Sequence, residues 1–233
     1  MFMSSTFEHQ DSIISVARHP TKNDPFLSAA KDGYIIVWKL EVPQLAAGES
    51  ENSDKDDMFK FVEDCDFNQP LTKAKWLTDQ CIIASTTTGR LLVFTTENSA
   101  NTYKKREIYQ TDSAIWDLCV HKGQKSTDIF VALDSGNIVS LNSDTLKPTQ
   151  VFSTVNQSVL CMSLDPIGDS LVLSVGTNSS VVLLKAKDGE FEEIHTIKGT
   201  SDNVSSIKTV GDKTMTTVYG TFNGRVAFFQ SEL

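Results

Sequence analysis

The chain alternates short apolar runs with polar turns, and the clearest example is 28–39, with the sequence SAAKDGYIIVWK. Asp32-Gly33 in this stretch and Asn223-Gly224 near the end are dipeptides that accept the positive φ of a tight hairpin turn. The residues after each such turn are rich in Val, Ile, Leu and Phe, which is typical of a largely buried strand. The pattern therefore predicts strand–turn–strand units.

Five such units recur along the chain. Each has a turn residue followed five positions later by a bulky one: Gly33 and Trp38, Gly89 and Phe94, Gly136 and Leu141, Ser179 and Leu184, Gly224 and Phe229. The turn residues are 56, 47, 43 and 45 positions apart, which is the spacing of a repeat architecture. In the fourth unit Asn178-Ser179 replaces glycine, and asparagine also tolerates positive φ.

Each unit also has an upstream and a downstream strand. The upstream segments align without gaps, with apolar residues at the first and fourth positions, over 13–17, 71–75, 115–119, 159–163 and 204–208. Downstream strands fit at 58–62, 105–109, 149–153 and 191–197. Four short strands per repeat is the pattern of a β-propeller blade.

These motifs resemble the WD-repeat (WD40-like) family over nearly the whole chain. Trp38 in SAAKDGYIIVWK stands at the tryptophan position of that family, and Lys39 stands where aspartate is usual. The segments VARHP and SLDP resemble the stretch that follows the family's first strand. The first unit is the only good match, because the other four lack the tryptophan and all lack the Gly-His pair. The resemblance implies that His9 forms a structural hydrogen bond within its blade.

We therefore predict an all-β fold, a single domain over 1–233 that forms a propeller of about five four-stranded blades. Residues 2–7 are expected to add the outer strand of the last unit, which closes the ring and hides a sheet edge. The alternatives are a propeller that a partner completes, a short form of a longer protein, and a generic antiparallel β fold.

An acidic insertion at about 41–57 follows the first unit. Its Glu and Asp residues are interleaved with Gly, Ser and Asn, a composition that buries little apolar surface and predicts a flexible loop. Ser53 precedes acidic residues and is a hypothetical phosphorylation site. Calcium binding through Asp54, Asp56 and Asp57 is a minor alternative, because the glycine and the distal glutamate of an EF-hand are missing.

Charge and composition limit the function. A net charge of −9 argues against direct binding of nucleic acid and is compatible with basic segments of partner proteins. No apolar run reaches membrane-spanning length, and no secretory signal is recognisable. The four cysteines lack Cys-x-x-Cys spacing, which favours buried free thiols, no structural metal site and a cytoplasmic or nuclear location.

The sequence offers little for catalysis. It contains no nucleophile elbow, phosphate loop or His-Glu-x-x-His motif, and no cofactor is expected. The upstream strand of each unit is expected to be the inner strand of its blade. Asp117 is the only acidic residue at the third position of these aligned inner strands, whereas glycoside hydrolysis needs two carboxylates. We therefore expect a non-enzyme; the alternative is a hydrolase or esterase with its active site in the central funnel.

The remaining candidates are contact residues. Trp116 occupies the second position of the third inner strand, where Ile14 and Leu160 stand in the first and fourth units. The WD-repeat resemblance implies that the rim near this position, including Asp117, contacts partner proteins, and tryptophan is enriched at binding hot spots. The alternative is that Trp116 packs between blades. The overall expectation is a scaffold or adaptor for protein–protein interactions within a multisubunit complex.

Overall fold

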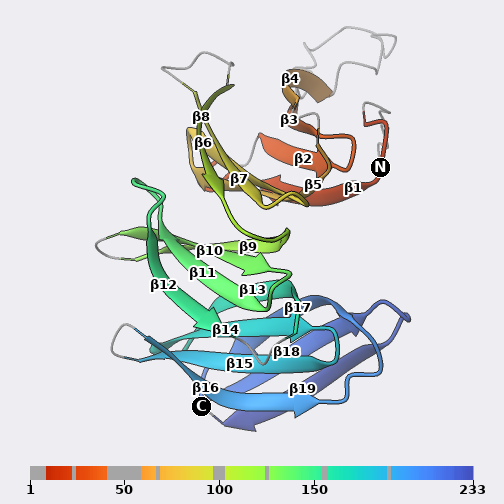
Figure 1. Cartoon of the computed structure of the whole chain (residues 1–233), viewed down its shortest axis with the longest axis vertical. Coiled ribbons are helices and arrows are strands. Elements are labelled where there is room, and N and C mark those ends of the chain that lie inside the picture. The colour runs from red at the N-terminus through yellow and green to blue at the C-terminus, as the bar shows by residue number, and fades with distance from the viewer. Residues whose placement is uncertain are drawn as a thin grey trace, which may run out of the picture. The chain divides into compact units, whose positions relative to one another are not determined.

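The computed structural model describes residues 9–22, 25–40, 59–66, 69–96, 103–123, 126–153, 157–187 and 190–232 (Figure 1). The strand predicted at 2–7 and the flexible insertion predicted at 41–57 lie outside these residues. Every regular element of the described chain is a β-strand. The chain divides into two compact units, Met1–Thr87 with Leu91–Ile108, and Thr88–Arg90 with Tyr109–Leu233.

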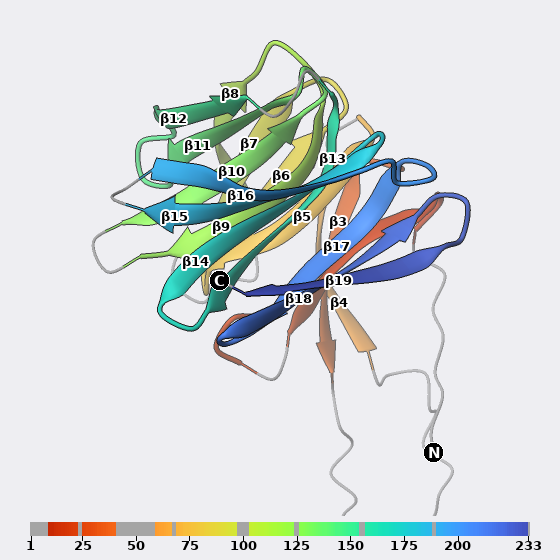
Figure 2. The same cartoon turned by 90° about the horizontal axis from the view of Figure 1, so that it is seen from below.

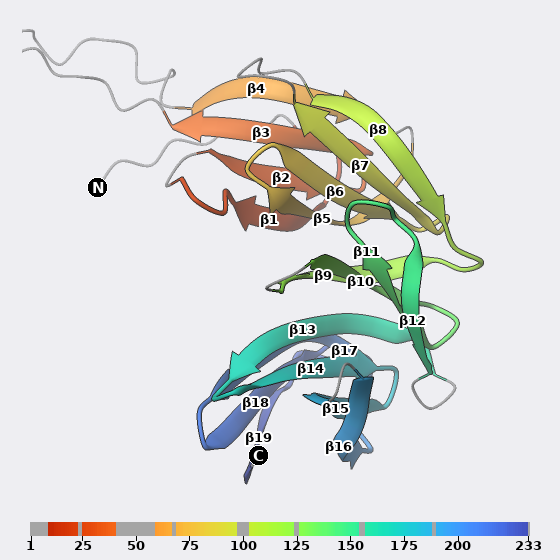
Figure 3. The ribbon, with the colours of Figure 1, turned by 90° about the vertical axis from the view of Figure 1, so that its left-hand side faces the viewer.

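The first unit contains two antiparallel sheets in which neighbouring strands are consecutive in sequence (Figure 3). The first sheet is built from β1 (Ile13–Arg18), β2 (Phe26–Ala30), β3 (Tyr34–Leu40) and β4 (Phe59–Asp66). The second is built from β5 (Leu71–Thr78), β6 (Cys81–Thr86), β7 (Arg90–Thr96) and β8 (Tyr103–Gln110).

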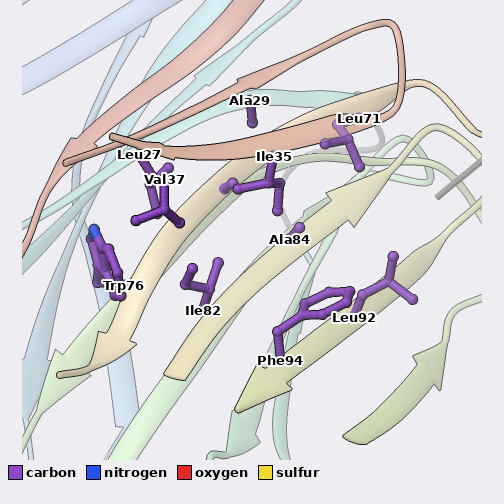
Figure 4. Close-up of a cluster of buried hydrophobic side chains, with 11 residues drawn as sticks. Leu27, Ala29, Ile35, Val37, Leu71, Trp76, Ile82, Ala84, Leu92 and Phe94 are labelled. Carbon is purple, nitrogen blue, oxygen red and sulfur yellow. The ribbon is translucent and has the colours of Figure 1, made fainter. Parts of the chain in front are cut away.

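One apolar cluster joins the two sheets of this unit (Figure 4). Leu27 of β2 and Val37 of β3 contribute from the first sheet, and Ile82 of β6 and Phe94 of β7 contribute from the second. Small residues stand among these large ones, and Ala84 is fully buried. Small side chains let two sheets approach closely while the large ones fill the space between them.

The second unit contains three sheets with the same consecutive order (Figures 1 and 2). The first is built from β9 (Ile115–Lys122), β10 (Thr127–Leu133), β11 (Asn137–Asn142) and β12 (Pro148–Ser153). The second is built from β13 (Val159–Ile167), β14 (Ser170–Thr177), β15 (Ser180–Lys187) and β16 (Glu190–Lys198). The third has three described strands, β17 (Val204–Gly211), β18 (Thr214–Thr221) and β19 (Val226–Glu232).

Two clusters hold these three sheets together. Phe130 and Leu173 belong to the cluster between the first and second sheets, and Val172 and Met215 belong to the cluster between the second and third. The two middle strands of the second sheet, β14 and β15, are buried on both sides along much of their length, and this sheet has a neighbour on each face. This burial explains why the sequence there shows continuous apolar runs rather than strict alternation.

The turns follow the sequence prediction in four of the five units. Gly33, Gly89, Gly136 and Gly224 all have φ between 79° and 89°, the region that favours glycine. The turn between β14 and β15 differs, because no described residue there has a positive φ. Instead, the hydroxyl of Thr177 accepts a 3.0 Å hydrogen bond from the Ser180 amide, so a side chain holds this turn in place of glycine.

The five predicted upstream strands and the four predicted downstream strands at 58–62, 105–109, 149–153 and 191–197 are confirmed within a few residues at their ends. Cys81, Cys119 and Cys161, three of the four cysteines, are buried thiols that form no disulfide with one another. Among the described residues, no helix is long and apolar enough to cross a membrane.

A hydrogen-bonded network around His9 stabilises the first sheet. The indole nitrogen of Trp38 donates to the Ser28 hydroxyl over 2.7 Å, and the same hydroxyl lies 2.7 Å from Nε2 of His9. Nδ1 of His9 lies 3.0 Å from Oδ2 of Asp32. With the His9 proton on Nδ1, every donor in this network has an acceptor. The indole donates to the hydroxyl, the hydroxyl donates to the imidazole, and the imidazole donates to the carboxylate. The hydrogen bond expected for His9 within its own sheet is therefore confirmed.

Asp32 receives further hydrogen bonds from the backbone. The amides of Gln10 and Tyr34 donate to its two oxygens over 2.8 and 2.9 Å. Burial alone raises the pKa of Asp32, but the two amides and His9 outweigh it and hold the pKa below the ordinary value of 3.8. Because the folded pKa is lowered, ionised Asp32 stabilises the fold above pH 3.8, and this contribution is lost as the pH falls through the folded pKa.

We predict that Asp32→Asn lowers the free energy of unfolding at pH 7 by about 1 kcal/mol or more, because it removes a charge-assisted acceptor. Urea unfolding at several pH values measures this difference, which should shrink below pH 3.8. Asp169→Asn, at an exposed turn, is the charge-matched control and should show a much smaller effect. A difference that stays constant down to pH 2 would contradict the assigned role.

Candidate functional site

The inner strand of every sheet has an irregularity at the same repeat position. The pairing register shifts across the second residue of β1, β5, β9, β13 and β17. The five residues at this position are Ile14, Thr72, Trp116, Leu160 and Ser205. A β-bulge leaves its extra residue outside the ladder and re-aims the side chain. We call this set the bulge positions.

The bulge positions lie at the end of each sheet where the inner strand begins. The turn between the second and third strands reaches the same end, since the amides of Lys31, Asp134 and Phe222 donate to carbonyls just ahead of β1, β9 and β17. Ser205 is exposed, and the other four bulge residues are half-buried. In the sheets of β1, β9 and β17, an accessible or partly accessible side chain therefore lies beside a tethered turn.

Trp116 is oriented by a hydrogen bond within its own sheet. Its Nε1 donates to Oδ1 of Asp134, in the turn between β10 and β11, over 2.9 Å. The amide of Asp134 in turn donates to the carbonyl of Ala114 over 2.9 Å, which fixes the turn against the start of β9. Trp116 is not among the side chains of the described core clusters. A half-buried ring held in one orientation can offer an apolar surface at a small entropic cost.

Leu160 and Ile14 occupy the equivalent bulges in their own sheets. Leu160 lies on β13, and β13 lies beside β9, the strand that bears Trp116. Ile14 lies in the other unit, where its side chain packs against the cluster of the first two sheets and remains half-buried.

Asp117 has a different environment from its neighbour. It is 4% exposed, and its two oxygens accept hydrogen bonds from the amides of Leu118 and Met162 over 2.8 and 2.9 Å. Met162 belongs to β13, so this carboxylate links the inner strands of two adjacent sheets. In this structure Asp117 contributes to packing between sheets, whereas Trp116 remains available at the end of the strand.

Asp165 is a second carboxylate that links two sheets, and it is 5% exposed. It accepts hydrogen bonds from the Ser163 hydroxyl and the Thr209 amide, and it forms an ion pair with Lys208. Both buried carboxylates therefore bind groups of the protein itself. No cluster of three or more His, Cys, Asp or Glu residues able to hold a metal ion occurs in the described part of the chain.

Alignment of the five internal repeats placed the bulge residues at one repeat position, but it could not identify the bulge itself. The sequence did contain one signal of the links between sheets. Ser15, Asp117 and Cys161 stand at the third position of three different inner strands, between the apolar first and fourth positions. These three side chains all bond to the backbone of the next inner strand. A polar side chain at a fixed offset in a buried strand indicates such a link.

We predict that Asp117→Ala lowers the free energy of unfolding by about 1–3 kcal/mol, because the Leu118 and Met162 amides lose a buried acceptor. Asp117→Asn should recover part of this loss, since its amide oxygen still accepts. Thermal or urea unfolding of the three proteins measures the order. Equal stability of the wild-type protein and Asp117→Ala would show that the link between sheets is not needed.

Comparison with known proteins agrees with the repeating sheets. The family model described as the NUP159/214 beta propeller matches residues 11–226, which include all but a few of the described residues. No curated protein matches the chain. The match confirms the predicted β-propeller family, and it is to a nucleoporin propeller rather than to the WD-repeat family as such. With its five antiparallel meanders and this match over most of its length, the chain belongs to the NUP159/214 beta-propeller family.

Proposed function

We propose that this protein is a non-catalytic propeller scaffold that binds other proteins within a multisubunit complex of the nucleoporin type. The observation that carries the proposal is the family match over 11–226. A location at the nuclear pore, on its nuclear or cytoplasmic side, follows from the same match. No observation favours the alternative of a hydrolase or esterase, because the two buried carboxylates described both bind groups of the protein.

The proposed contact surface is centred on Trp116 and Leu160, with Ile14 as the equivalent position of the first sheet. A hydrogen bond fixes the Trp116 ring without removing it from solvent. Tryptophan held in this way is typical of a binding hot spot, where a few residues provide most of the affinity. Asp117 supports this surface from beneath, by holding β9 against β13.

We also propose that the first blade is of the WD-repeat type. The support is the network of His9, Ser28, Asp32 and Trp38, which links the start of the unit, its second strand, its turn and its third strand. The other blades lack the equivalent tryptophan and histidine.

A single domain of about five blades, closed by a strand from residues 2–7, is part of the proposal. The last sheet has three described strands, which leaves an edge at β19 for a fourth. One face of that sheet packs in the cluster around Met215, and the other face, which no described element of its unit covers, carries the exposed residues Val210, Val218, Val226 and Phe228. Closure of the ring would hide both this edge and this face.

We predict that Trp116→Ala reduces the recovery of partner proteins at least tenfold when the tagged chain is purified from its native cells. Quantitative mass spectrometry of the purified complexes measures the loss. Val151→Ala, at an exposed apolar position of β12, is the matched control. Unchanged recovery with Trp116→Ala, in a variant with wild-type thermal stability, would remove Trp116 from the contact surface.

The next prediction tests whether the propeller ring closes. If the ring closes, Phe228→Lys buries a charge and lowers the free energy of unfolding by more than about 2 kcal/mol, whereas Val151→Lys has little effect. Deletion of residues 1–8 should also convert a monomer near 25.7 kDa into aggregates, as measured by size-exclusion chromatography with light scattering. A wild-type chain that aggregates alone, is soluble only inside a larger complex and tolerates Phe228→Lys would mean that a partner completes the propeller.

A further inference from the structure

An open cleft of about 370 Å³ lies between the first two sheets of the second unit. One wall is formed by His121 at the end of β9 and by Asp128 and Phe130 of β10. The other wall is formed by Ala186 of β15 and by Glu190 and Phe191 of β16. The cleft is at the opposite end of β9 from Trp116, so it is separate from the bulge positions.

The repeat position of His121 has a counterpart in the first two sheets of the chain. His19 and His121 stand at the same repeat position, just past or at the end of an inner strand. In the first unit, Trp76 of the next inner strand packs on His19 with 4.7 Å between ring centroids, and His19 is 4% exposed. The residue aligned with Trp76 in the fourth repeat is Leu164, and His121 is only half-buried. A leucine thus stands where a tryptophan fills the corresponding space between the first two sheets.

The cleft has two carboxylates without a counter-charge. Neither Asp128 nor Glu190 forms an ion pair with any residue that the structure describes. Asp128 has one long contact of 3.5 Å to the Ser126 hydroxyl. Lys187 is opposite Glu190 in the β15–β16 register, but its ammonium group bonds to the two oxygens of Glu192 over 3.3 Å each.

The aromatic part of the cleft is rigid. Phe191 makes edge-to-face contacts with Phe130 and with Phe152, at centroid distances of 5.7 and 5.4 Å. Phe130 is buried, whereas Phe191 is half-buried and retains an accessible part. An aromatic ring fixed in this way beside two carboxylates is suited to a planar cation, which stacks on the ring and donates hydrogen bonds to the carboxylates.

We infer that this cleft binds an arginine side chain presented by an extended segment of a partner protein. The inference rests on the proposed function as a protein-binding scaffold and gives it a second, chemically specific contact. Arginine fits better than lysine, because its guanidinium group is planar, donates in a fork and loses less hydration on stacking. The cleft opens between β12 and β16, which are edge strands of their sheets, so an extended segment has access to it. The net charge of −9 attracts a basic segment at long range.

The direct test is an NMR titration of the whole chain with the capped peptide Gly-Leu-Arg-Leu-Gly. The same peptide with citrulline, which keeps the planar shape and loses the charge, is the matched control. We expect shifts of the amides of β10 and β16 with the arginine peptide, and binding at least tenfold weaker with citrulline. Equal binding of both peptides, or shifts confined to other strands, would overturn the inference.

Single variants test whether Asp128 and Glu190 bind the arginine peptide. Asp128→Asn and Glu190→Gln should each weaken binding of the arginine peptide about tenfold. Asp112→Asn changes the net charge equally at an exposed position ahead of β9, remote from the cleft, and should leave binding unchanged. If Asp112→Asn weakens binding as much as Asp128→Asn, the attraction is general and no arginine site exists here.

Purification from native cells separates this inference from the proposed function. If the wild-type chain recovers partners and Asp128→Asn loses at least one of them, the arginine site and the scaffold function are both supported. If the variant retains every partner, the arginine site is wrong and the scaffold function is not affected. If the wild-type chain recovers no partner, the proposed function itself fails, whatever the peptide titration shows.

Discussion

Within each unit, the packing of the sheets depends on side chains that link the inner strand of one sheet to the inner strand of the next, where no backbone ladder joins them. Each inner strand pairs with the second strand of its own sheet, and no ladder joins it to the inner strand of the neighbouring sheet. Short polar side chains bridge them instead: the Ser15 hydroxyl donates to the Ala74 carbonyl, Asp117 accepts from the Met162 amide, and Asp165 accepts from the Thr209 amide. Each bridge satisfies a buried backbone group that would otherwise be costly, and thereby sets the position of one sheet on its neighbour.

The bulges and the bridges are two aspects of one arrangement. A bulge at the second residue leaves a backbone irregularity near the start of the strand and directs that residue away from the ladder. The third residue then faces the neighbouring sheet, where Ser15, Asp117 and Cys161 form their bonds. The consequence is that a residue free for contact and a residue committed to packing stand next to each other in sequence. Trp116 and Asp117 are the clearest pair.

The sequence was sufficient for the elements that depend on local chemistry. Gly33 and Gly136 predicted hairpin turns because their φ requirement is met by few other residues, and the apolar runs after them predicted buried strands. It was not sufficient for features that depend on pairing between strands. The bulge at Trp116 is a property of the register between β9 and β10, so no single-strand pattern identifies it. In the turn at Ser179, a hydroxyl three residues before the strand replaced the glycine, which spacing alone does not reveal.

The same limit applies to the candidate site. Alignment placed Trp116, Leu160 and Ile14 in one column, and the structure gives that column a shared backbone geometry. It also placed Asp117 beside them as a contact residue, and burial to 4% exposure instead gives the carboxylate a role between sheets. The cleft near His121 was not predictable, because its walls come from two different sheets and its volume depends on how their side chains fill the space between them. Volume differences between repeats become visible only when the neighbours of each residue are known.

A repeated backbone that carries different side chains is well suited to a scaffold. The bulge positions share one geometry and hold isoleucine, threonine, tryptophan, leucine and serine, so each sheet presents a different chemistry from the same location. The bridges beneath keep that geometry fixed, which limits the entropy lost when a partner binds. Within each unit, varied contact residues on a shared backbone geometry give specificity through their pattern, since a partner must match several of them. A catalytic site makes the opposite demand, that several reactive groups converge on one point, and both buried carboxylates described are instead bonded within the frame. The bonds that hold these two carboxylates are therefore the same bonds that position the sheets.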